Sequence, residues 1–449
     1  MFKQSLLLIV VLLSSAAAAV AEKSYEIGLA KVDITPDEPL WLSGYGFRNK
    51  PAEGKVHELC AKAVAFRDAA GTRLVLVTLD LGSVNPSSTD YVAKKVEQKF
   101  GLPRAALVLN CSHTHCAPEI CAERRLICHY PDEQETKLVK YLEELNDKLV
   151  DLVGLALADL RPAELSVSRS NAGFAHNRRG PGGINPNGPV DHDVPVLRIS
   201  GSDGQLRGLL FGYACHNTTL NFQKYCGDYA GFAQYDLEAD HPGAIAMFVM
   251  GCGGDQNPQP RHGPMGLEHA KNHGRALADA VNKALGDEQK PVDGSLRMAY
   301  EVVTLDLEPL PSIERLRSDA AKPVTEIPSR KAQYLLSLID AAKQVPLTQE
   351  CPLHAANFGD DLLMIFVSGE TLVDYSLRCK SEFAGPFVWV AGYCDDVFAY
   401  LPSRRVLLEG GYEGRTNVQH QLLAAPFQPS VEDRVMQSIH KLVKQVSDE

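Results

Sequence analysis

The sequence is poor in aromatic residues and has no surplus of positive charge. Phe, Trp and Tyr make up 7% of its 449 residues, and 45 Lys and Arg stand against 56 Asp and Glu, for a net charge of -11. An acidic balance argues against a protein whose main task is to hold nucleic-acid phosphates. With 45% hydrophobic and 22% charged residues, the chain is globular and long enough for one large domain or two ordinary ones.

Several common catalytic and nucleotide-binding motifs are missing. The sequence contains no HExxH, no G-x-S-x-G nucleophile elbow, no P-loop and no GxGxxG. The glycine-rich run from Gly251 to Asp255 follows an apolar stretch as a phosphate loop does, but it lacks the Lys-Ser/Thr ending. The sequence therefore gives no support to a nucleotide-binding function.

The first residues have the pattern of a secretory signal peptide. Lys3 precedes the apolar run from Leu6 to Leu13, and Ala19 to Ala21 forms a small-residue cleavage site. An uncleaved anchor is the alternative, but the run is well short of the roughly 20 residues that span a bilayer. We expect a signal peptide over 1–21 and an exported mature chain, periplasmic or secreted, with no transmembrane segment and a net charge that changes from -11 to -12 with the loss of Lys3.

Short apolar runs alternate with helical patterns along the chain, which is typical of an α/β protein. Strands are expected at about 26–34, 62–67, 73–80, 106–110, 194–199, 207–214, 244–250, 298–305, 362–367 and 387–392. Helices are expected around 88–100, 134–159, 268–285, 329–344 and 432–446. Residues 180–189 must form a loop, and the proline-containing stretch 308–328 indicates a surface excursion. No boundary divides the mature chain, so a single domain over 22–449 is expected, with a mixed β-sheet core flanked by helices.

Residues that can bind metal or move a proton follow four of the expected strands. Loops converge at the carboxyl ends of strands in open α/β sheets, so residues far apart in sequence can meet there. This pattern predicts a metal site at the carboxyl ends of the strands. The residues are His113 and His115 after the first of these strands, His216 after the second, Glu370 after the third, and Asp395, Asp396 and Tyr400 after the fourth.

Each of these residues also has an ordinary structural interpretation. His113 and His115 alternate by two, so on an extended segment both rings project to one side, yet paired histidines at a strand end are often structural. Glu370 follows a glycine and could cap a helix. Imidazoles with a carboxylate nevertheless suit zinc, and a catalytic zinc keeps one position open for water.

The eleven cysteines leave at least one thiol unpaired if the compartment is oxidising. Four of them, Cys111, Cys116, Cys121 and Cys128, crowd the segment around the histidine pair, and Cys215 precedes His216. Disulfides, buried free thiols and thiolate ligands of zinc are all possible from the spacing. We favour disulfides or buried thiols over zinc ligation.

Together these motifs resemble the catalytic domain of the neutral/alkaline non-lysosomal ceramidases, which are zinc-dependent amidases. The resemblance runs from Tyr25 to about Gly414. Its most specific pieces are Ser112 to His115, Cys226 to Gly231, Gly254-Asp255, Ser368 to Glu370, and Tyr400 followed by Tyr412-Glu413-Gly414. The resemblance implies one Zn²⁺ per chain, held by His113, His216, Glu370 and Tyr400.

The resemblance also implies assisting roles for His115, for Arg178 in an Asn-Arg motif, and for Tyr412. The alternative interpretation is that Arg178 is an ordinary surface arginine. One departure concerns Asn257, which stands where the family carries a serine and can neither act as a nucleophile nor lose a proton near neutral pH. A further departure follows the helix expected near 432–446, after which we do not expect the family's β-sandwich-like C-terminal domain.

The sequence thus leads to three functional hypotheses. The first is an exported zinc hydrolase that cleaves the amide of N-acyl sphingosine or a related N-acyl lipid, in sphingolipid metabolism, with catalytic residues His115, Arg178, Tyr412 and Asn257. The second, motivated by Asn257, is a zinc hydrolase of the same fold acting on a polar amide, an ester or a glycan derivative. The third is a catalytically inactive binding protein that retains the fold. Each has a small-molecule or lipid partner and none involves nucleic acid.

Overall fold

The computed structural model describes residues 25–121, 131–180, 184–185, 187–323 and 326–447. The expected signal peptide and Cys128 lie outside these residues, as does part of the expected loop 180–189. In its described part, that loop contains neither helix nor strand.

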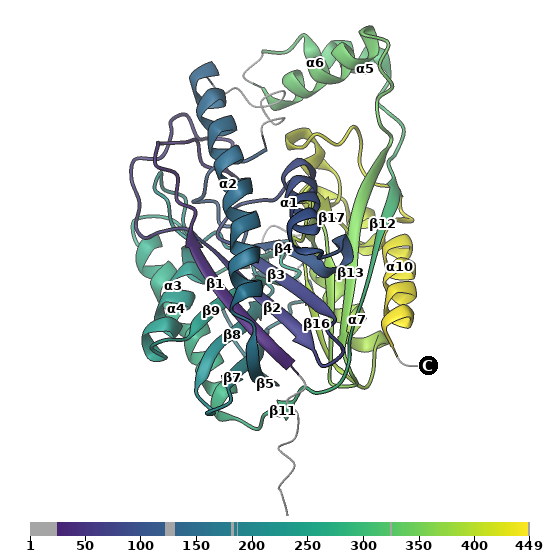
Figure 1. Ribbon diagram of the computed structural model, residues 1–449. Helices are drawn as coiled ribbons and strands as arrows, with labels where there is room; N and C mark the ends of the chain where they lie inside the picture. The colour runs from purple at the N-terminus through teal and green to yellow at the C-terminus, as the bar shows by residue number, and fades with distance from the viewer. Residues whose placement is uncertain (1–24, 122–130, 181–183, 186, 324–325, 448–449) are drawn as a thin grey trace, which may run out of the picture.

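A large mixed sheet forms the first half of the structure (Figure 1). Its strand order is β4-β3-β2-β1-β5-β7-β8-β9, and β11 pairs with β5. The pairs β3–β4 and β8–β9 are parallel, and the other pairs are antiparallel. The strands are β1 (Tyr25–Asp33), β2 (Cys60–Asp68), β3 (Arg73–Leu79), β4 (Leu107–Cys111), β5 (Arg161–Asn171), β7 (Asp193–Gly201), β8 (Leu206–Tyr213), β9 (Ile245–Met250) and β11 (Lys290–Pro291).

A second sheet, of order β12-β13-β14-β16, comes from the last third of the chain. Its strands are β12 (Leu296–Asp306), β13 (Thr348–Phe358), β14 (Leu362–Val367) and β16 (Phe387–Ala391), and only the pair β14–β16 is parallel. Two short ladders complete the described strands: β6 (Ala175–Asn177) with β10 (Gln256–Pro258), and β15 (Glu370–Thr371) with β17 (Tyr400–Leu401).

The two sheets pack face to face, and helices cover both outer faces. Side chains alternate along each strand, so in β14 Leu362, Met364 and Phe366 join the core between the sheets. The intervening Leu363 and Ile365 face the outer helices of the second sheet. The order of layers is therefore helix, sheet, sheet, helix.

Helices α1 to α4 cover the first sheet, and α7 and α10 pack on the second, whereas α6 extends the core of that sheet at one end of the molecule (Figure 1). None of the helices within the described residues is both long enough and apolar enough to cross a membrane. The helices are α1 (Pro86–Phe100), α2 (Asp132–Ala158), α3 (Asp228–Asp240), α4 (Gly266–Gly286), α5 (Ile313–Ala320), α6 (Ile327–Asp340), α7 (Val373–Glu382), α8 (Arg404–Glu409), α9 (Gly411–Gly414) and α10 (Val431–Val446).

The expected α/β fold is confirmed, and each predicted strand and helix overlaps an observed one. The core consists of two mixed sheets, because hydrophobic alternation identifies a strand but not the sheet that it joins. The expected surface excursion 308–328 contains α5 and the start of α6, which lie at one end of the molecule (Figure 1).

Asn110 connects the two ends of the first sheet and also reaches the second. Its Oδ1 accepts a hydrogen bond from the Met250 amide of β9 at 2.8 Å, and its Nδ2 donates to the Gly392 carbonyl after β16 at 2.7 Å. Asn110 is fully buried, near the carboxyl end of β4. Asn110 thereby brings together the ends of β4, β9 and β16, and candidate site residues follow each of these strands.

Candidate metal centre

Three side chains from distant segments converge beyond the carboxyl ends of β4, β8 and β14. The Nε2 atoms of His113 and His216 lie 3.3 and 3.2 Å from Oε2 of Glu370. All three residues are buried, and their ligating atoms lie within 4.8 Å of one another. The prediction that His113, His216 and Glu370 meet at strand ends is confirmed.

Local backbone geometry determines the position of these side chains. His113 lies in a turn two residues after β4, with a left-handed φ of 59°. Gly369 also has positive φ, 79°, and a Cβ there would lie 2.9 Å from the Phe398 ring. Glu370 pairs with Tyr400 in the short β15–β17 ladder. The three side chains thus meet where the backbone is strained at His113 and depends on a glycine at Gly369.

The hydrogen bonds of the two imidazoles determine what the centre can hold. Nδ1 of His113 lies 2.5 Å from the Gly82 carbonyl oxygen, and Nδ1 of His216 lies 2.6 Å from that of Gly253. Because a carbonyl can only accept, each Nδ1 carries the proton, and a neutral ring then has a lone pair on Nε2. Two lone pairs and a carboxylate oxygen therefore face one another, an arrangement that a cation stabilises.

The protonation states agree with this assignment. Burial, together with the nearby Arg178, lowers the pKa of His216 to about 4, so its ring is neutral at pH 7. Burial raises the pKa of the Glu370 carboxyl, but the attraction that His113 and His216 exert on the carboxylate when either ring is protonated holds the pKa well below its ordinary value. A neutral imidazole and an ionised carboxylate are the forms that ligate metals.

Tyr400 lies at the same point. Its hydroxyl is 3.3 Å from Nε2 of His216, and its ring stacks on that imidazole with an interplanar angle of 12°. Ligand atoms about 2.0–2.1 Å from a tetrahedral zinc lie roughly 3.3–3.4 Å apart. The His113–Glu370, His216–Glu370 and His216–Tyr400 separations therefore fit a zinc ion.

His115 adjoins this group. Its Nε2 lies 3.2 Å from Nε2 of His113, and its Nδ1 is buried and has no hydrogen-bond partner in the described structure. Burial and the neighbouring imidazoles of His113 and His216 hold the pKa of His115 well below its usual value. The two rings of the pair do meet, although a turn and not the expected extended segment brings them together.

Arg178 lies across the centre from His115. Its Nη1 is 3.4 Å from Nε2 of His216, and its guanidinium stands 5.1 Å from the Tyr400 ring centroid and 5.7 Å from that of Tyr412. Glu413 accepts from Arg178 Nε at 2.6 Å. Nη2 is buried without a hydrogen-bond partner in the described part of the chain. This arginine is thus held at the centre with one donor group unused.

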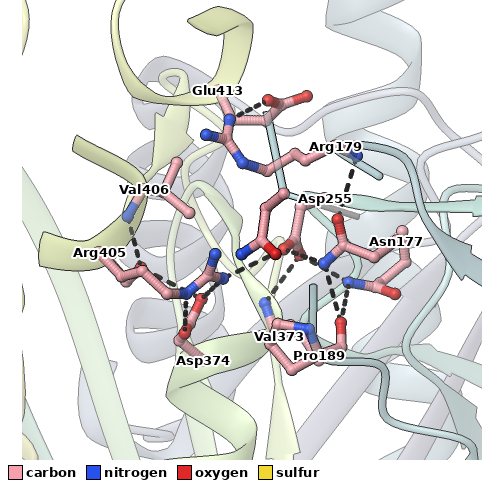
Figure 2. A network of polar contacts seen from close by, with 12 residues as sticks. Asn177, Arg179, Pro189, Asp255, Val373, Asp374, Arg405, Val406 and Glu413 are labelled. Atoms are coloured by element: carbon pink, nitrogen blue, oxygen red, sulfur yellow. Dashed lines mark hydrogen bonds and ion pairs between the residues drawn. The ribbon is translucent and has the colours of Figure 1, made fainter. Parts of the chain in front are cut away.

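A polar network holds the two neighbours of Arg178 in the chain, Asn177 and Arg179 (Figure 2). Arg179 forms a 2.6 Å ion pair with the second oxygen of Glu413. Asn177 donates to the buried Asp255 at 3.0 Å, and the Asp255 carbonyl accepts from the Arg178 amide at 2.8 Å. The chain on both sides of Arg178 is therefore fixed by buried charge-assisted contacts.

Tyr412 and Asn257 occupy different surroundings. Tyr412 is 41% exposed, and its ring lies 5.4 Å from that of Tyr400, so it marks the solvent side of the centre. Asn257 is buried in β10, and its Oδ1 has no partner within the described residues. It follows Gln256, whose carbonyl accepts from the His216 amide at 3.0 Å. Asn257 thus lies on a strand that contacts the metal-binding segment.

Two strand-end carboxylates have other roles. Asp395 binds Arg104 at 2.7 Å, His354 at 2.6 Å and the Leu109 amide at 2.9 Å, which links the two sheets. Asp396 lines a separate cavity. The fourth strand end therefore contributes Tyr400 but neither aspartate to the group.

The ten described cysteines are all free thiols, and nine of them are buried. The group found within the described residues that could hold a metal ion consists of two histidines and a glutamate and includes no thiol. Cys111 and Cys116 are core residues, as the buried-thiol interpretation predicts, whereas Cys121 is half-buried.

Tyr393 is a neighbour of the centre that the sequence analysis did not identify. Its ring centroid lies 4.7 Å from that of His113. The signal available in the sequence was its position directly after β16, in the same run as Tyr400. Gly82 and Gly253, which fix the imidazoles through backbone carbonyls, carry no sequence signal for that role.

A cavity of about 460 Å³ borders segments next to the candidate metal centre, although none of the candidate ligands lines it. Val84 on its wall is two residues from Gly82, and Phe398, which also lines it, packs against Gly369. The remaining wall is mainly apolar and comes from α6 and the segment after α9, including Leu335, Leu338, Leu423 and Ala424. The cavity thus adjoins Gly369, directly before Glu370, and the loop whose Gly82 carbonyl contacts His113.

Comparison with known proteins places this arrangement in a family. The family model described as neutral/alkaline non-lysosomal ceramidase, N-terminal, matches residues 25–260. A neutral ceramidase of Mycobacterium tuberculosis is 25% identical over 268 residues, which cover 54% of this chain and 41% of that protein. A neutral ceramidase of Drosophila melanogaster is 22% identical over 236 residues, which cover 49% and 32%. The matches thus span less than half the length of these relatives.

Solved structures match over nearly the whole chain. Neutral ceramidase from Pseudomonas aeruginosa superposes with a TM-score of 0.73 at 20% identity, covering 95% of this chain and 76% of that one. A ceramidase complexed with C2 gives the same TM-score at 19% identity and covers 95% and 75%. The fold is therefore that of neutral ceramidase, and the chain, matched by the family model over more than half its length, belongs to the neutral/alkaline non-lysosomal ceramidase family of hydrolases.

Proposed function

We propose that this chain is a zinc-dependent amidase that hydrolyses an N-acyl lipid such as N-acyl sphingosine. One Zn²⁺ per chain is held by His113, His216, Glu370 and Tyr400. The observation that carries this proposal is the fixed tautomer of both histidines, which directs two lone pairs at the Glu370 carboxylate.

A bound zinc ion supplies Lewis acidity and a water of lowered pKa. The residues around it bind and orient the substrate. Arg178, with its unused Nη2, is suited to stabilise negative charge that develops on an acyl oxygen. His115 is neutral and adjoins His113, so it can accept a proton or a hydrogen bond at the reacting group. Tyr412, at the solvent side, can contact the substrate as it enters.

The apolar cavity supports a lipid as the substrate. A hydrocarbon chain needs an apolar environment, and Leu335, Leu338 and Phe398 provide one next to the segments that carry the metal ligands. The names of the relatives, neutral ceramidases, point to the same class of substrate. We propose that this cavity receives one hydrocarbon chain of the substrate.

Asn257 supports a second candidate, a zinc hydrolase for a polar amide, ester or glycan derivative. Its buried, unpartnered Oδ1 can accept a hydrogen bond from a polar substrate. Its amide cannot replace a serine hydroxyl in any step that needs one. This candidate retains the metal centre and changes only the substrate.

The metal content of the purified chain tests both candidates. We expect one zinc per chain in the wild type and loss of that zinc in His113→Ala. His440→Ala is the control, because His440 lies on the exposed face of α10 and pairs with Glu382. A wild-type chain with substoichiometric zinc would instead support a binding protein without catalysis.

Substrate assays separate the two candidates. Release of fatty acid from a ceramide in detergent, lost with a chelator and restored with zinc, supports the lipid amidase. If the zinc-loaded chain leaves N-acyl lipids intact but hydrolyses polar amides or esters, the second candidate replaces the first. We further propose that the mature chain, 22–449, is exported as one domain, which N-terminal sequencing of the processed protein tests.

A further inference from the structure

Tyr393 lies inside the metal-binding group, although it has no role in the proposed reaction. Its ring centroid is 4.7 Å from that of His113 and 6.1 Å from that of His216. The side chain is fully buried. Tyr393 therefore contacts one proposed ligand directly and lies close to another.

The hydroxyl group of Tyr393 has no hydrogen-bond partner within the described structure. Several buried phenols elsewhere in the core do have one: Tyr141 donates to the Ile34 carbonyl at 2.7 Å and Tyr213 to that of Ala172 at 2.6 Å, whereas Tyr25, far from the centre in β1, has none among the described residues. A buried hydroxyl without a partner is costly, and at a binding site it indicates a group that the protein itself does not supply.

The backbone fixes Tyr393 between the two segments that carry His113 and Glu370. Its amide donates to the Gly369 carbonyl at 3.0 Å, and its carbonyl accepts from the Cys111 amide at 3.3 Å. Its φ of 56° is left-handed, which is unfavourable for an aromatic residue and is maintained by these contacts. The ring is thus held in place from both sides.

An ordinary phenol is protonated at neutral pH, so the Tyr393 hydroxyl has a hydrogen to donate.

We propose that Tyr393 is a further positioning residue of the metal centre. Its hydroxyl donates a hydrogen bond to an oxygen of the water or substrate held between His113 and Glu370. The inference rests on the proposed function, because it requires that an ion occupies the group. It adds a residue to the centre that lies outside the set of ligands and assisting residues proposed above.

The test compares wild type with Tyr393→Phe, which removes only the hydroxyl. Tyr141→Phe is the matched control, since it removes a hydroxyl that donates to a carbonyl in the core beside α2. Zinc affinity is measured by competition with a chelating dye, and the visible spectrum is recorded with Co²⁺ in place of zinc. Thermal midpoints are measured for each protein with and without zinc.

We expect Tyr393→Phe to lower zinc affinity by about 10-fold to 100-fold and to shift the Co²⁺ bands. We also expect it to raise the thermal midpoint of the metal-free protein, because an unpaired buried hydroxyl is removed. Tyr141→Phe should lower the midpoint with and without zinc and leave affinity and spectrum unchanged. If Tyr393→Phe matches wild type in affinity and spectrum, the role of Tyr393 is refuted while the metal centre stands. If wild type binds neither ion, both proposals fail.

Discussion

The carbonyl oxygen of Gly253 accepts a hydrogen bond from Nδ1 of His216 at 2.6 Å, and this contact aims the opposite nitrogen at Glu370. A Cβ on residue 253 would lie 2.9 Å from the Cys215 amide nitrogen. Gly253→Ala should therefore displace the segment before His216 and weaken zinc binding by roughly 10-fold to 100-fold. A chelator competition assay measures this change.

The control for this substitution is Gly286→Ala, at the end of α4, where an added Cβ meets nothing within 4 Å. It should bind zinc as the wild type does. Equal affinities in Gly253→Ala and wild type would show that the carbonyl contact does not orient His216.

Glu413 forms ion pairs with the guanidinium groups of the half-buried Arg178 and the buried Arg179. Glu413→Ala leaves both without that carboxylate, and such a loss typically costs about 3–5 kcal/mol. We expect a reduction of that size in the free energy of unfolding, measured with urea. Glu301→Ala, which breaks an ion pair with the exposed Lys441, should change it by less than about 1 kcal/mol.

Arg178→Ala should separate catalysis from metal binding. If its unused Nη2 stabilises charge on the acyl oxygen, kcat falls by about 10²–10³-fold while zinc content stays at the wild-type level. Steady-state kinetics on the best substrate, with metal analysis of the same sample, measure both quantities. Loss of zinc in this variant would show that Arg178 maintains the structure of the metal site and would contradict a role in catalysis alone.

Asp396 makes the stability of the protein depend on pH. Burial, with Asp395 and Asp90 nearby, raises its pKa to about 7 from an ordinary value of 3.8. Between about pH 4 and 7 the folded protein keeps this proton and the unfolded chain loses it, so the contribution of Asp396 to stability falls as pH rises through that window. Asp396→Asn should be more stable than wild type at pH 8, by at most about 4 kcal/mol, and similar at pH 4.

Denaturant titrations at the two pH values test this prediction. Asp433→Asn serves as the control, because its carboxyl is exposed on α10 and 53% accessible. A constant difference between Asp396→Asn and wild type at pH 4 and pH 8 would contradict the assignment.

The cavity allows a test of chain length. Leu338→Trp places a larger side chain in the cavity wall contributed by α6. If one hydrocarbon chain occupies the cavity, turnover of long-chain N-acyl lipids should fall at least about 10-fold, while that of a two-carbon acyl analogue changes little. Equal losses for long and short acyl chains would place the hydrocarbon elsewhere.

Strands with strong apolar runs could be predicted from the sequence, and the less regular ones could not. β5 (Arg161–Asn171) carries serines and two arginines among its alternating residues, and β13 contains Pro352 and His354, which weaken the strand pattern. α3 is buried on several sides and includes Gly231, so it lacks an amphipathic stripe. Packing between layers, not local pattern, determines these elements.

Residue types and strand ends were enough to predict that His113, His216 and Glu370 meet. The same reasoning could not distinguish Asp395, which links Arg104 and His354, from a site residue. It also could not find Tyr393, because a tyrosine after an apolar strand is usually a core residue. Side-chain direction depends on the turn that follows each strand, and sequence spacing does not specify that turn.

The proposed metal ligands come from both sheets, so an ion bound to them affects how the sheets are held together. His113 and His216 follow strands of the first sheet, whereas Glu370 follows β14 of the second, 154 positions beyond His216. An ion bound to all three would act as a cross-link between the two sheets and would close a long loop of chain, which restricts the unfolded ensemble. Removing the ion should therefore loosen the interface between the sheets as well as abolish the reaction, and chelation and thermal unfolding should reinforce one another.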